Sequence, residues 1–298
     1  MSIERVLCCR AQVGEGAIWS VAEAALYWVD ITARELHRYD PAEGIDHCWQ
    51  LTSEVGCCAP LDDGRVLLAL EEGFTLFDPV NGCSELLGCP VDMPEASRFN
   101  DGTVDLRGRF LAGTLPKTGA GTEPQGKLYV LDGRSQVRCL EQRDFLIQNG
   151  LAFSPDGRVL YVSDSGPAVQ AVWRYAYDPE GGVCSERRLH FDMRSARGRP
   201  DGAAMDVDGC YWIAAVDGWS LLRLTPTGEV DRVIELPVQK PSKPAFGGAD
   251  MRTLFVTSIS SGLDPNDPVH AEAGNLFALD VGVQGMEVGP ADSRMFTV

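Results

Sequence analysis

Short apolar runs that follow tight-turn residues recur six times along the chain. In one of them Gly157 opens a turn, and the next five residues, Arg-Val-Leu-Tyr-Val, have the composition of a half-buried strand. The six runs lie at residues 23–28, 64–69, 108–113, 157–162, 209–214 and 252–257. Their length and turn signals predict the second strand of a hairpin in each of six repeats.

A further apolar run follows each of these strands and ends in turn residues, often Asp-Pro. These runs lie at residues 36–41, 74–79, 128–133, 172–179, 221–226 and 276–280. Since no segment shows a convincing helical stripe, the pattern predicts an all-β fold, with one four-stranded blade per repeat. We expect residues 1–298 to form a single six-bladed β-propeller, whose ring is closed when residues 6–12 and 294–298 share the last blade.

One position keeps the same register in every repeat. Counting back eight residues from each of the first six runs gives Glu15, Gly56, Asn100, Asn149, Asp201 and Pro244, at spacings of 41, 44, 49, 52 and 43 residues. In a radial arrangement, equivalent positions from different repeats converge on one axis. Four of these six side chains carry oxygen, so the register predicts a ring of oxygens around the axis.

A ring of two carboxylates and two amides is typical of a site for a hard divalent cation such as Ca²⁺, Mg²⁺ or Mn²⁺. Three or four protein ligands leave coordination positions open, as a Lewis-acid site requires. Taken singly, Glu15 is a loop carboxylate between glycines, and Asn149-Gly150 and Asp201-Gly202 are ordinary turn dipeptides. Their common register favours the ligand interpretation.

Composition narrows the function classes further. The chain has 298 residues, a formal net charge of −17 and a pI of about 4.6, which disfavour nucleic acid and anionic membrane surfaces as partners. The first residues resemble neither a secretory signal nor a membrane anchor, so we expect a cytoplasmic protein.

The ten cysteines show no zinc-finger spacing and are expected to be reduced. The four histidines lie outside the register, which gives histidine-based catalysis little support.

Three segments depart from the repeat, at residues 115–126, 194–200 and 260–274, and all are rich in Gly, Pro or polar residues. Insertions in a propeller lie on its faces. The first of them is expected to form either part of a substrate rim or an ordinary surface loop.

Several segments resemble the SMP-30/gluconolactonase/regucalcin family. They are Gly-Glu-Gly-Ala-Ile-Trp from Gly14, Arg-Phe-Asn-Asp-Gly-Thr-Val-Asp from Arg98, Asn-Gly-Leu-Ala-Phe-Ser-Pro-Asp-Gly from Asn149, Arg-Pro-Asp-Gly-Ala-Ala-Met-Asp from Arg199 and Ala-Phe-Gly-Gly-Ala-Asp from Ala245. The resemblance extends from about residue 13 to residue 280, and it rests on the order and spacing of these motifs.

The resemblance implies a six-bladed propeller with one divalent ion held by Glu15, Asn149 and Asp201. It also implies that Arg98 and Asn100 contact a sugar lactone and that Asp201 doubles as the general base. Some family members carry a substrate-contacting Glu where this chain has Thr118, which leaves the identity of the sugar open. Calcium, zinc, magnesium, manganese and iron all occur in the family, so the ligands leave the metal open too.

These observations predict metal-dependent hydrolysis of an aldonolactone to its aldonic acid in sugar catabolism. Arg98, Asn100 and Asp101 would orient the ring hydroxyls, although a salt bridge that supports the loop is an alternative role for Arg98. Whether Asp201 or the ion activates the water is left open.

Two other functions compete with lactone hydrolysis. One is hydrolysis of a phosphotriester on the same propeller, and the other is a non-catalytic propeller that binds calcium or a protein partner. We expect a monomer or a weak homo-oligomer.

Overall fold

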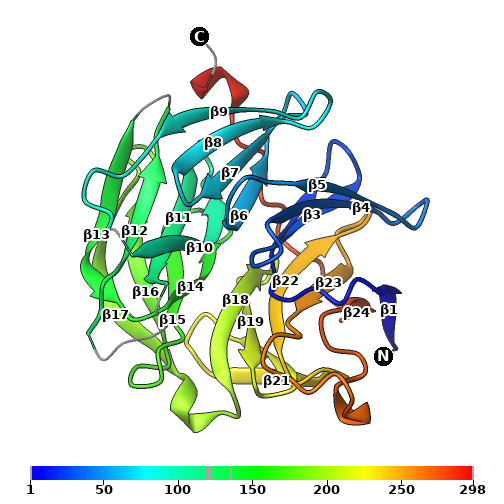
Figure 1. Ribbon diagram of the computed structural model, residues 1–298. Coiled ribbons are helices and arrows are strands. Elements are labelled where there is room, and N and C mark those ends of the chain that lie inside the picture. The colour runs from blue at the N-terminus through cyan, green and yellow to red at the C-terminus, as the bar shows by residue number, and fades with distance from the viewer. Residues whose placement is uncertain (1, 95, 118–122, 134–135, 297–298) are drawn as a thin grey trace.

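The computed structural model describes residues 2–94, 96–117, 123–133 and 136–296, and over these residues it forms six four-stranded antiparallel sheets. The sheets are arranged in a ring like the blades of a propeller (Figure 1). The predicted all-β, six-bladed propeller is therefore confirmed. None of the described helices has the length and apolar character needed to cross a membrane.

In each of the first five blades, four consecutive strands lead from the axis outward. The first blade contains β2 (Gly14–Ser20), β3 (Ala25–Asp30), β4 (Glu35–Asp40) and β5 (Ile45–Gln50). The second contains β6 (Val55–Pro60), β7 (Val66–Leu70), β8 (Gly73–Asp78) and β9 (Cys83–Gly88). The third contains β10 (Ser97–Val104), β11 (Phe110–Pro116), β12 (Gly126–Leu131) and β13 (Val137–Phe145). The fourth contains β14 (Gln148–Phe153), β15 (Val159–Asp164), β16 (Ala171–Asp178) and β17 (Val183–Asp192). The fifth contains β18 (Arg199–Met205), β19 (Tyr211–Val216), β20 (Ser220–Leu224) and β21 (Val230–Glu235).

The sixth blade combines the first strand of the chain with its last three strands. It contains β22 (Pro241–Gly247), β23 (Thr253–Ser258), β24 (Leu276–Asp280) and, as its outer strand, β1 (Ile3–Leu7). The expectation for residues 294–298 differs from the structure, because Ser293–Met295 form a 3-10 helix (η3) and residues 297–298 lie outside the described part. The preceding segment crosses one end of the ring instead, where Gly285 bridges Asp206 and Ala291 bridges Leu61.

The three segments that depart from the repeat lie between or at the ends of strands. Residues 115–126 include the end of β11 and the start of β12, and positions 118–122 among them lie outside the described part. Residues 194–200 overlap the 3-10 helix η1 (Met193–Ser195), and residues 260–274 contain η2 (Pro268–His270).

All six inner strands, β2, β6, β10, β14, β18 and β22, have an irregular pairing with their neighbour at or beside the ring position. Gly16 and Gly150, which follow Glu15 and Asn149, have φ values of +61° and +63°. A bulge of this kind adds a residue to one strand and changes the direction of the neighbouring side chain. Asn149-Gly150 is therefore part of a strand irregularity and not of a hairpin turn.

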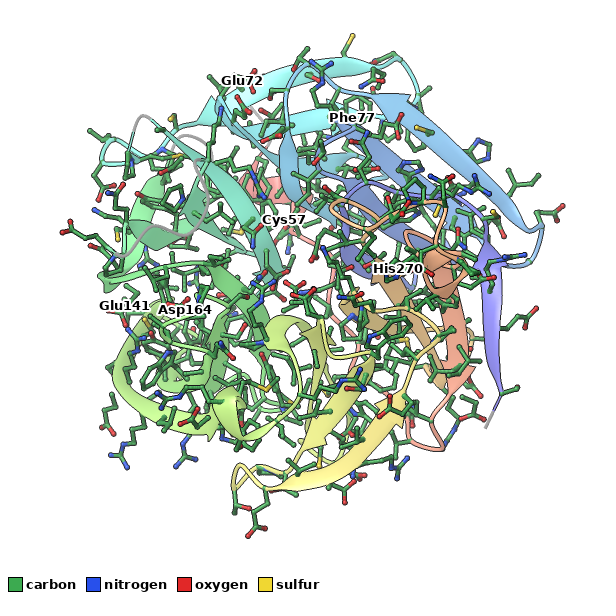
Figure 2. The ribbon with its side chains drawn as sticks, turned by 60° about the horizontal axis from the view of Figure 1, so that its bottom comes forward. Cys57, Glu72, Phe77, Glu141, Asp164 and His270 are labelled. Atoms are coloured by element: carbon green, nitrogen blue, oxygen red, sulfur yellow. The ribbon has the colours of Figure 1, made fainter. Side chains whose placement is uncertain are left out.

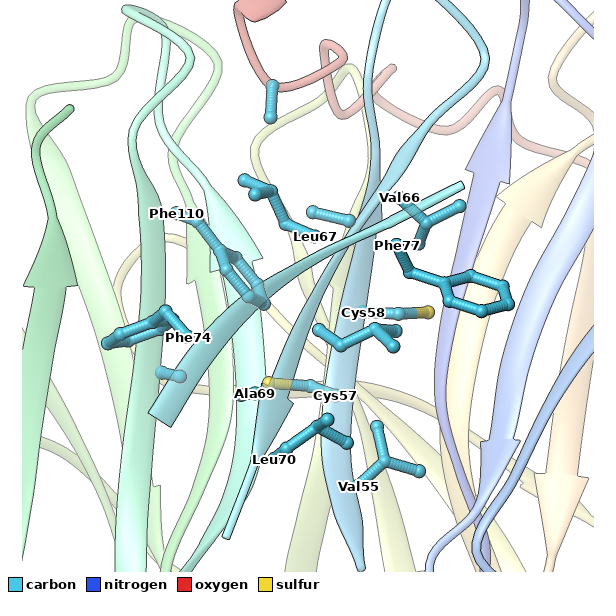
Figure 3. Packing of buried hydrophobic residues seen from close by; sticks show 14 of the residues in the cluster. Val55, Cys57, Cys58, Val66, Leu67, Ala69, Leu70, Phe74, Phe77 and Phe110 are labelled. Carbon is cyan, nitrogen blue, oxygen red and sulfur yellow. The ribbon is translucent and has the colours of Figure 1, made fainter. Parts of the chain in front are cut away.

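The adjacent cysteines of β6 fill the space between blades. Figure 3 shows Cys57 and Cys58 on opposite sides of the strand, as alternation along a strand requires. The Cys58 thiol lies 3.7 Å from the carbonyl oxygen of Gly16 in the first blade, whereas the Cys57 thiol faces Gly102 of the third. Both are buried free thiols, consistent with small core residues.

Two buried aspartates fix the backbone just before the ring positions. Asp30 accepts hydrogen bonds from the backbone N–H groups of Gln12 and Val13, at 2.7 and 3.0 Å, two residues ahead of Glu15. Asp164 does the same for Leu146 and Ile147, at 2.9 and 3.0 Å, two residues ahead of Asn149. The carboxylates thus replace the strand partners that these N–H groups lack and position the two ring residues.

We expect Asp164→Ala to lower the free energy of unfolding by about 3 kcal/mol, because three backbone N–H groups, including that of Gly166, lose a charged acceptor in the interior. Urea unfolding monitored by circular dichroism measures the change. Asp178→Ala is the matched control, since Asp178 also accepts backbone hydrogen bonds but in an exposed turn. Equal losses in the two variants would contradict the positioning role of Asp164.

Candidate metal centre

A chain of hydrogen bonds joins the oxygen-bearing ring residues of the third, fourth and fifth blades. Arg98 Nη1 donates to Asn100 Oδ1 at 2.9 Å, and Asn100 Nδ2 donates to Asn149 Oδ1 at 2.8 Å. Asn149 Nδ2 then donates to Asp201 Oδ1 at 2.6 Å. Residues that are about 50 apart in sequence, at spacings of 49 and 52, thus meet at the axis.

Glu15 belongs to the same buried site. Its side chain is 5% exposed, and its Oε2 accepts a hydrogen bond from the backbone N–H of Gly16 at 3.1 Å. Burial and the neighbouring Asp101 raise the pKa of Glu15 to about 8. Burial and the charge of Glu15 raise the pKa of Asp201 well above its ordinary value. Two carboxylates that disfavour each other's charge in this way need a cation if both are to be ionised.

The donor set fits a divalent ion. Within the described part of the chain, no hydrogen bond reaches Glu15 Oε1 or Asp201 Oδ2, and Asn149 Oδ1 accepts only one, so each residue keeps a lone pair available. All three donors are oxygens, which suits a hard cation. Glu15, Asn149 and Asp201 are therefore the residues that would hold the ion.

Asp101 differs from the role expected for it. Its Oδ1 accepts from Lys243 Nζ at 2.6 Å and its Oδ2 from the backbone N–H of Leu151 at 2.7 Å, and its side chain has no exposed surface. Both oxygens are thus engaged by the protein, and neither is exposed to solvent. In place of the sugar contact expected for it, Asp101 pairs with Lys243 and holds the strand next to Asn149.

Arg98 reaches from the axis to a polar pocket on one face of the ring. The guanidinium donates to the carbonyl of Phe99 at 2.8 Å and lies 3.6 Å from Glu54 Oε2. Burial lowers the pKa of Arg98, and the charges of Glu15 and Asp201 act on it in the opposite sense. The pocket has a volume of about 460 Å³ and is lined by Arg34, Thr52, Ser53, Glu54, Glu71, Arg98 and Lys117. Thr118, where family members differ, lies outside the described residues.

A second cavity lies at the other end of the inner strands. It has a volume of about 250 Å³, and its apolar walls include Trp19, Phe153, Met205 and Phe246, with residues 286–290 of the C-terminal segment on one side. The ring carboxylates lie near the starts of the inner strands, at the same end as Arg98 and the polar pocket, whereas this cavity lies near the ends of those strands. Cys57, which lies near the start of β6, shows the position of these strand starts close to the centre of the ring in Figure 2.

Lys243 is the site residue that sequence reasoning missed. It is 5% exposed and directly precedes the ring position of the sixth blade, Pro244. A lysine inside an otherwise uncharged inner strand was the available signal, because a buried ammonium group requires a carboxylate partner. Ser165, which accepts from Asn149 Nδ2 at 2.8 Å, had no such signal.

Comparison with known proteins agrees with this fold. The model of the SMP-30/gluconolactonase/LRE-like region matches residues 13–260. The chain belongs to this family. The resemblance predicted from the ring motifs is thereby confirmed.

Two curated relatives match over nearly their whole length. A 6-deoxy-6-sulfogluconolactonase of Pseudomonas putida is 41% identical over 276 residues, which cover 92% of this chain and 92% of the relative. Pentonolactonase XacC of Haloferax volcanii is 33% identical over 300 residues, which cover 99% of this chain and 100% of the relative.

Among solved structures, the calcium-binding protein regucalcin from Agrobacterium tumefaciens superposes with a TM-score of 0.86. It is 27% identical, and the match covers 95% of this chain and 94% of that one. A luciferin-regenerating enzyme has a TM-score of 0.88 at 26% identity, with coverage of 98% and 99%.

Proposed function

We propose that this protein hydrolyses a sugar lactone to the corresponding aldonic acid at a divalent metal centre formed by Glu15, Asn149 and Asp201. The observation that carries the proposal is the convergence of two buried carboxylates and an amide oxygen beside a polar pocket. The lactonase names of the two curated relatives support the same reaction class.

A divalent ion at this centre supplies Lewis-acid polarisation of the lactone carbonyl and stabilises the negative charge that develops on its oxygen. Asp201 would take a proton from the attacking water, and the support for this role is that its Oδ1 accepts a hydrogen bond from Asn149 while its Oδ2 remains available. The water oxygen bonds to the carbonyl carbon, the ring C–O bond breaks, and the proton passes to the departing ring oxygen.

Arg98 and Asn100 would orient the lactone. Arg98 lines the polar pocket and also donates to Asn100, which in turn donates to Asn149. Two hydrogen bonds therefore connect Arg98, which would contact the substrate, to the metal ligand Asn149. Asp101 acts indirectly, through its ion pair with Lys243.

Acid release from a panel of xylono-, arabinono-, galactono- and gluconolactones, followed with a pH indicator, tests the proposal. The uncatalysed opening is subtracted, and each assay is repeated with a chelator. Chelator-sensitive turnover of at least one lactone is the expected result. Binding of calcium without turnover of any lactone would favour the non-catalytic alternative, and cleavage of a phosphotriester alone would favour the other hydrolase.

We further propose that the preferred lactone carries an anionic substituent such as a sulfonate. The pocket presents three cationic side chains, Arg34, Arg98 and Lys117, although the chain's net charge is −17. Lys117 pairs with Glu71 at 2.6 Å and Arg98 lies near Glu54, whereas no ion pair engages Arg34 within the described part. Arg34 is thus available for an anion, and the 41% identical relative is named for a sulfonated gluconolactone.

We expect Arg34→Gln to lower kcat/KM for a 6-sulfonated gluconolactone about tenfold, mainly through KM, since one charge-assisted hydrogen bond is lost. Turnover of unsubstituted gluconolactone should change less than about twofold. Arg188→Gln, which changes an exposed arginine on the outer strand of the fourth blade, is the control. An equal loss with both lactones would contradict recognition of the sulfonate by Arg34.

A further inference from the structure

A second group of ligand-type side chains lies far from the axis, on the outer strands of the first blade. Trp28, His37 and Cys48 are directly opposite one another on β3, β4 and β5, so their side chains share one face of the sheet. Glu35 is two residues before His37 on β4 and shares that face. In Figure 1, β4 and β5 form the outer edge of this blade.

The side-chain atoms of this face are spaced like the ligands of a tetrahedral zinc ion. His37 Nε2 lies 3.3 Å from Glu35 Oε2 and 3.8 Å from Cys48 Sγ, and the three ligand atoms all lie within 4.8 Å of one another. Ordinary zinc bond lengths with tetrahedral angles give an N···O separation of about 3.3 Å and an N···S separation of about 3.6 Å. The two separations from Nε2 are thus close to those of ligands on one ion, and Glu35 Oε2 and Cys48 Sγ lie within 4.8 Å of each other.

Asp46 and Trp28 fix the orientation of the imidazole. His37 Nδ1 lies 2.7 Å from Asp46 Oδ2, and the other oxygen of Asp46 accepts from Trp28 Nε1 at 3.3 Å. The Trp28 ring stacks on the imidazole with centroids 3.8 Å apart. Nδ1 thus faces a carboxylate while Nε2 faces Glu35 and Cys48, which is the arrangement of a metal-bound histidine with its supporting carboxylate.

We propose that Glu35, His37 and Cys48 form a second metal site, separate from the axial centre, which binds Zn²⁺ or a metal of similar preference. The nitrogen and sulfur donors distinguish it from the all-oxygen set at the axis. Binding replaces the proton of the Cys48 thiol, which passes to the solvent. His37 is 7% exposed, but Cys48 is exposed and Glu35 half-buried, so the ion has an entry path and water can complete its shell. The ion would join the outer hairpin of the first blade across β4 and β5.

Co²⁺ is a suitable probe, since it occupies zinc sites and gives an intense near-ultraviolet charge-transfer absorption only when a thiolate is bound. We expect this band when the full-length, chelator-stripped and reduced protein is titrated with Co²⁺. Cys48→Ser and His37→Gln should lose it, with circular dichroism as the check on folding. Cys83→Ser, which changes an exposed cysteine of β9, should keep it. A wild-type protein without the band, or a band unchanged in Cys48→Ser, would overturn the proposal.

Calorimetric titration with Zn²⁺ separates the two centres. In an Asp201→Asn background, which removes a ligand from the axial centre, one high-affinity zinc equivalent should persist and should disappear when Cys48→Ser is added. Asp46→Asn should weaken this zinc affinity about 10- to 100-fold through the loss of the supporting carboxylate. An Asp201→Asn protein that binds no zinc tightly would refute the site and leave His37 as a structural partner of Glu35 and Asp46.

Discussion

Asp201→Asn is expected to lower kcat/KM for the lactone by at least about 10³-fold without loss of the fold. Asparagine has nearly the same volume as aspartate, and its Oδ1 can still accept the hydrogen bond from Asn149 Nδ2. The substitution removes the negative charge that would bind the ion and the group that would take a proton from water. The pH-indicator assay measures turnover, and thermal unfolding followed by circular dichroism checks the fold.

The metal-free Asp201→Asn protein should be at least as stable as the metal-free wild type, because the substitution removes a buried carboxyl group whose ionisation is disfavoured by burial and by Glu15. Asp156→Asn is the matched control, since Asp156 is a carboxylate in the exposed hairpin turn of the fourth blade. It should keep wild-type turnover. Activity of Asp201→Asn within about tenfold of the wild type would refute the assigned role of Asp201.

The middle strands of each blade could be predicted because their signals are local. The first six apolar runs correspond to β3, β7, β11, β15, β19 and β23, and the following six to β4, β8, β12, β16, β20 and β24. The outer strands gave a weaker signal, as β5 and β9 show. Their residues are mostly exposed, with burial patterns that lack strict alternation, so no apolar periodicity marks them.

The ring of oxygens could be predicted because repetition converts a register in sequence into proximity in space. Asn100, Asn149 and Asp201 are hydrogen-bonded neighbours although they belong to three different blades. Interactions between residues that lie outside this shared register could not be predicted from the repeats. Lys243 and Asp101 are 142 residues apart, and their ion pair depends on how the sixth blade packs against the third across the axis. The position of the C-terminal segment could not be predicted either, because nothing in the repeat pattern indicates its contact with Leu61.

Removal of the divalent ion is expected to abolish lactone turnover, and the affinity for the ion is expected to rise with pH. Burial and neighbouring charges raise the pKa of Glu15 to about 8 and that of Asp201 well above its ordinary value in the metal-free protein. The ion binds the ionised carboxylates, so it must displace their protons. Each proton displaced makes the affinity increase about tenfold per pH unit below the group's pKa. Titration with Mn²⁺ at about pH 6, 7 and 8 measures this dependence.

The same shifts set the sign of the stability change in the metal-free protein. A carboxyl whose pKa is raised by folding stabilises the native state while it is protonated, and this stability is lost as pH rises through the folded-state pKa. The unfolding temperature of the metal-free wild type should therefore fall between about pH 6 and pH 9, and saturating Mn²⁺ should remove most of that fall. Glu15→Gln, which keeps the size of the side chain but cannot ionise, should show a smaller fall without metal. If the metal-free wild type and Glu15→Gln lose stability equally, the buried carboxylate pair does not control the site's response to pH, and the electrostatic argument for the cation at the axis is refuted.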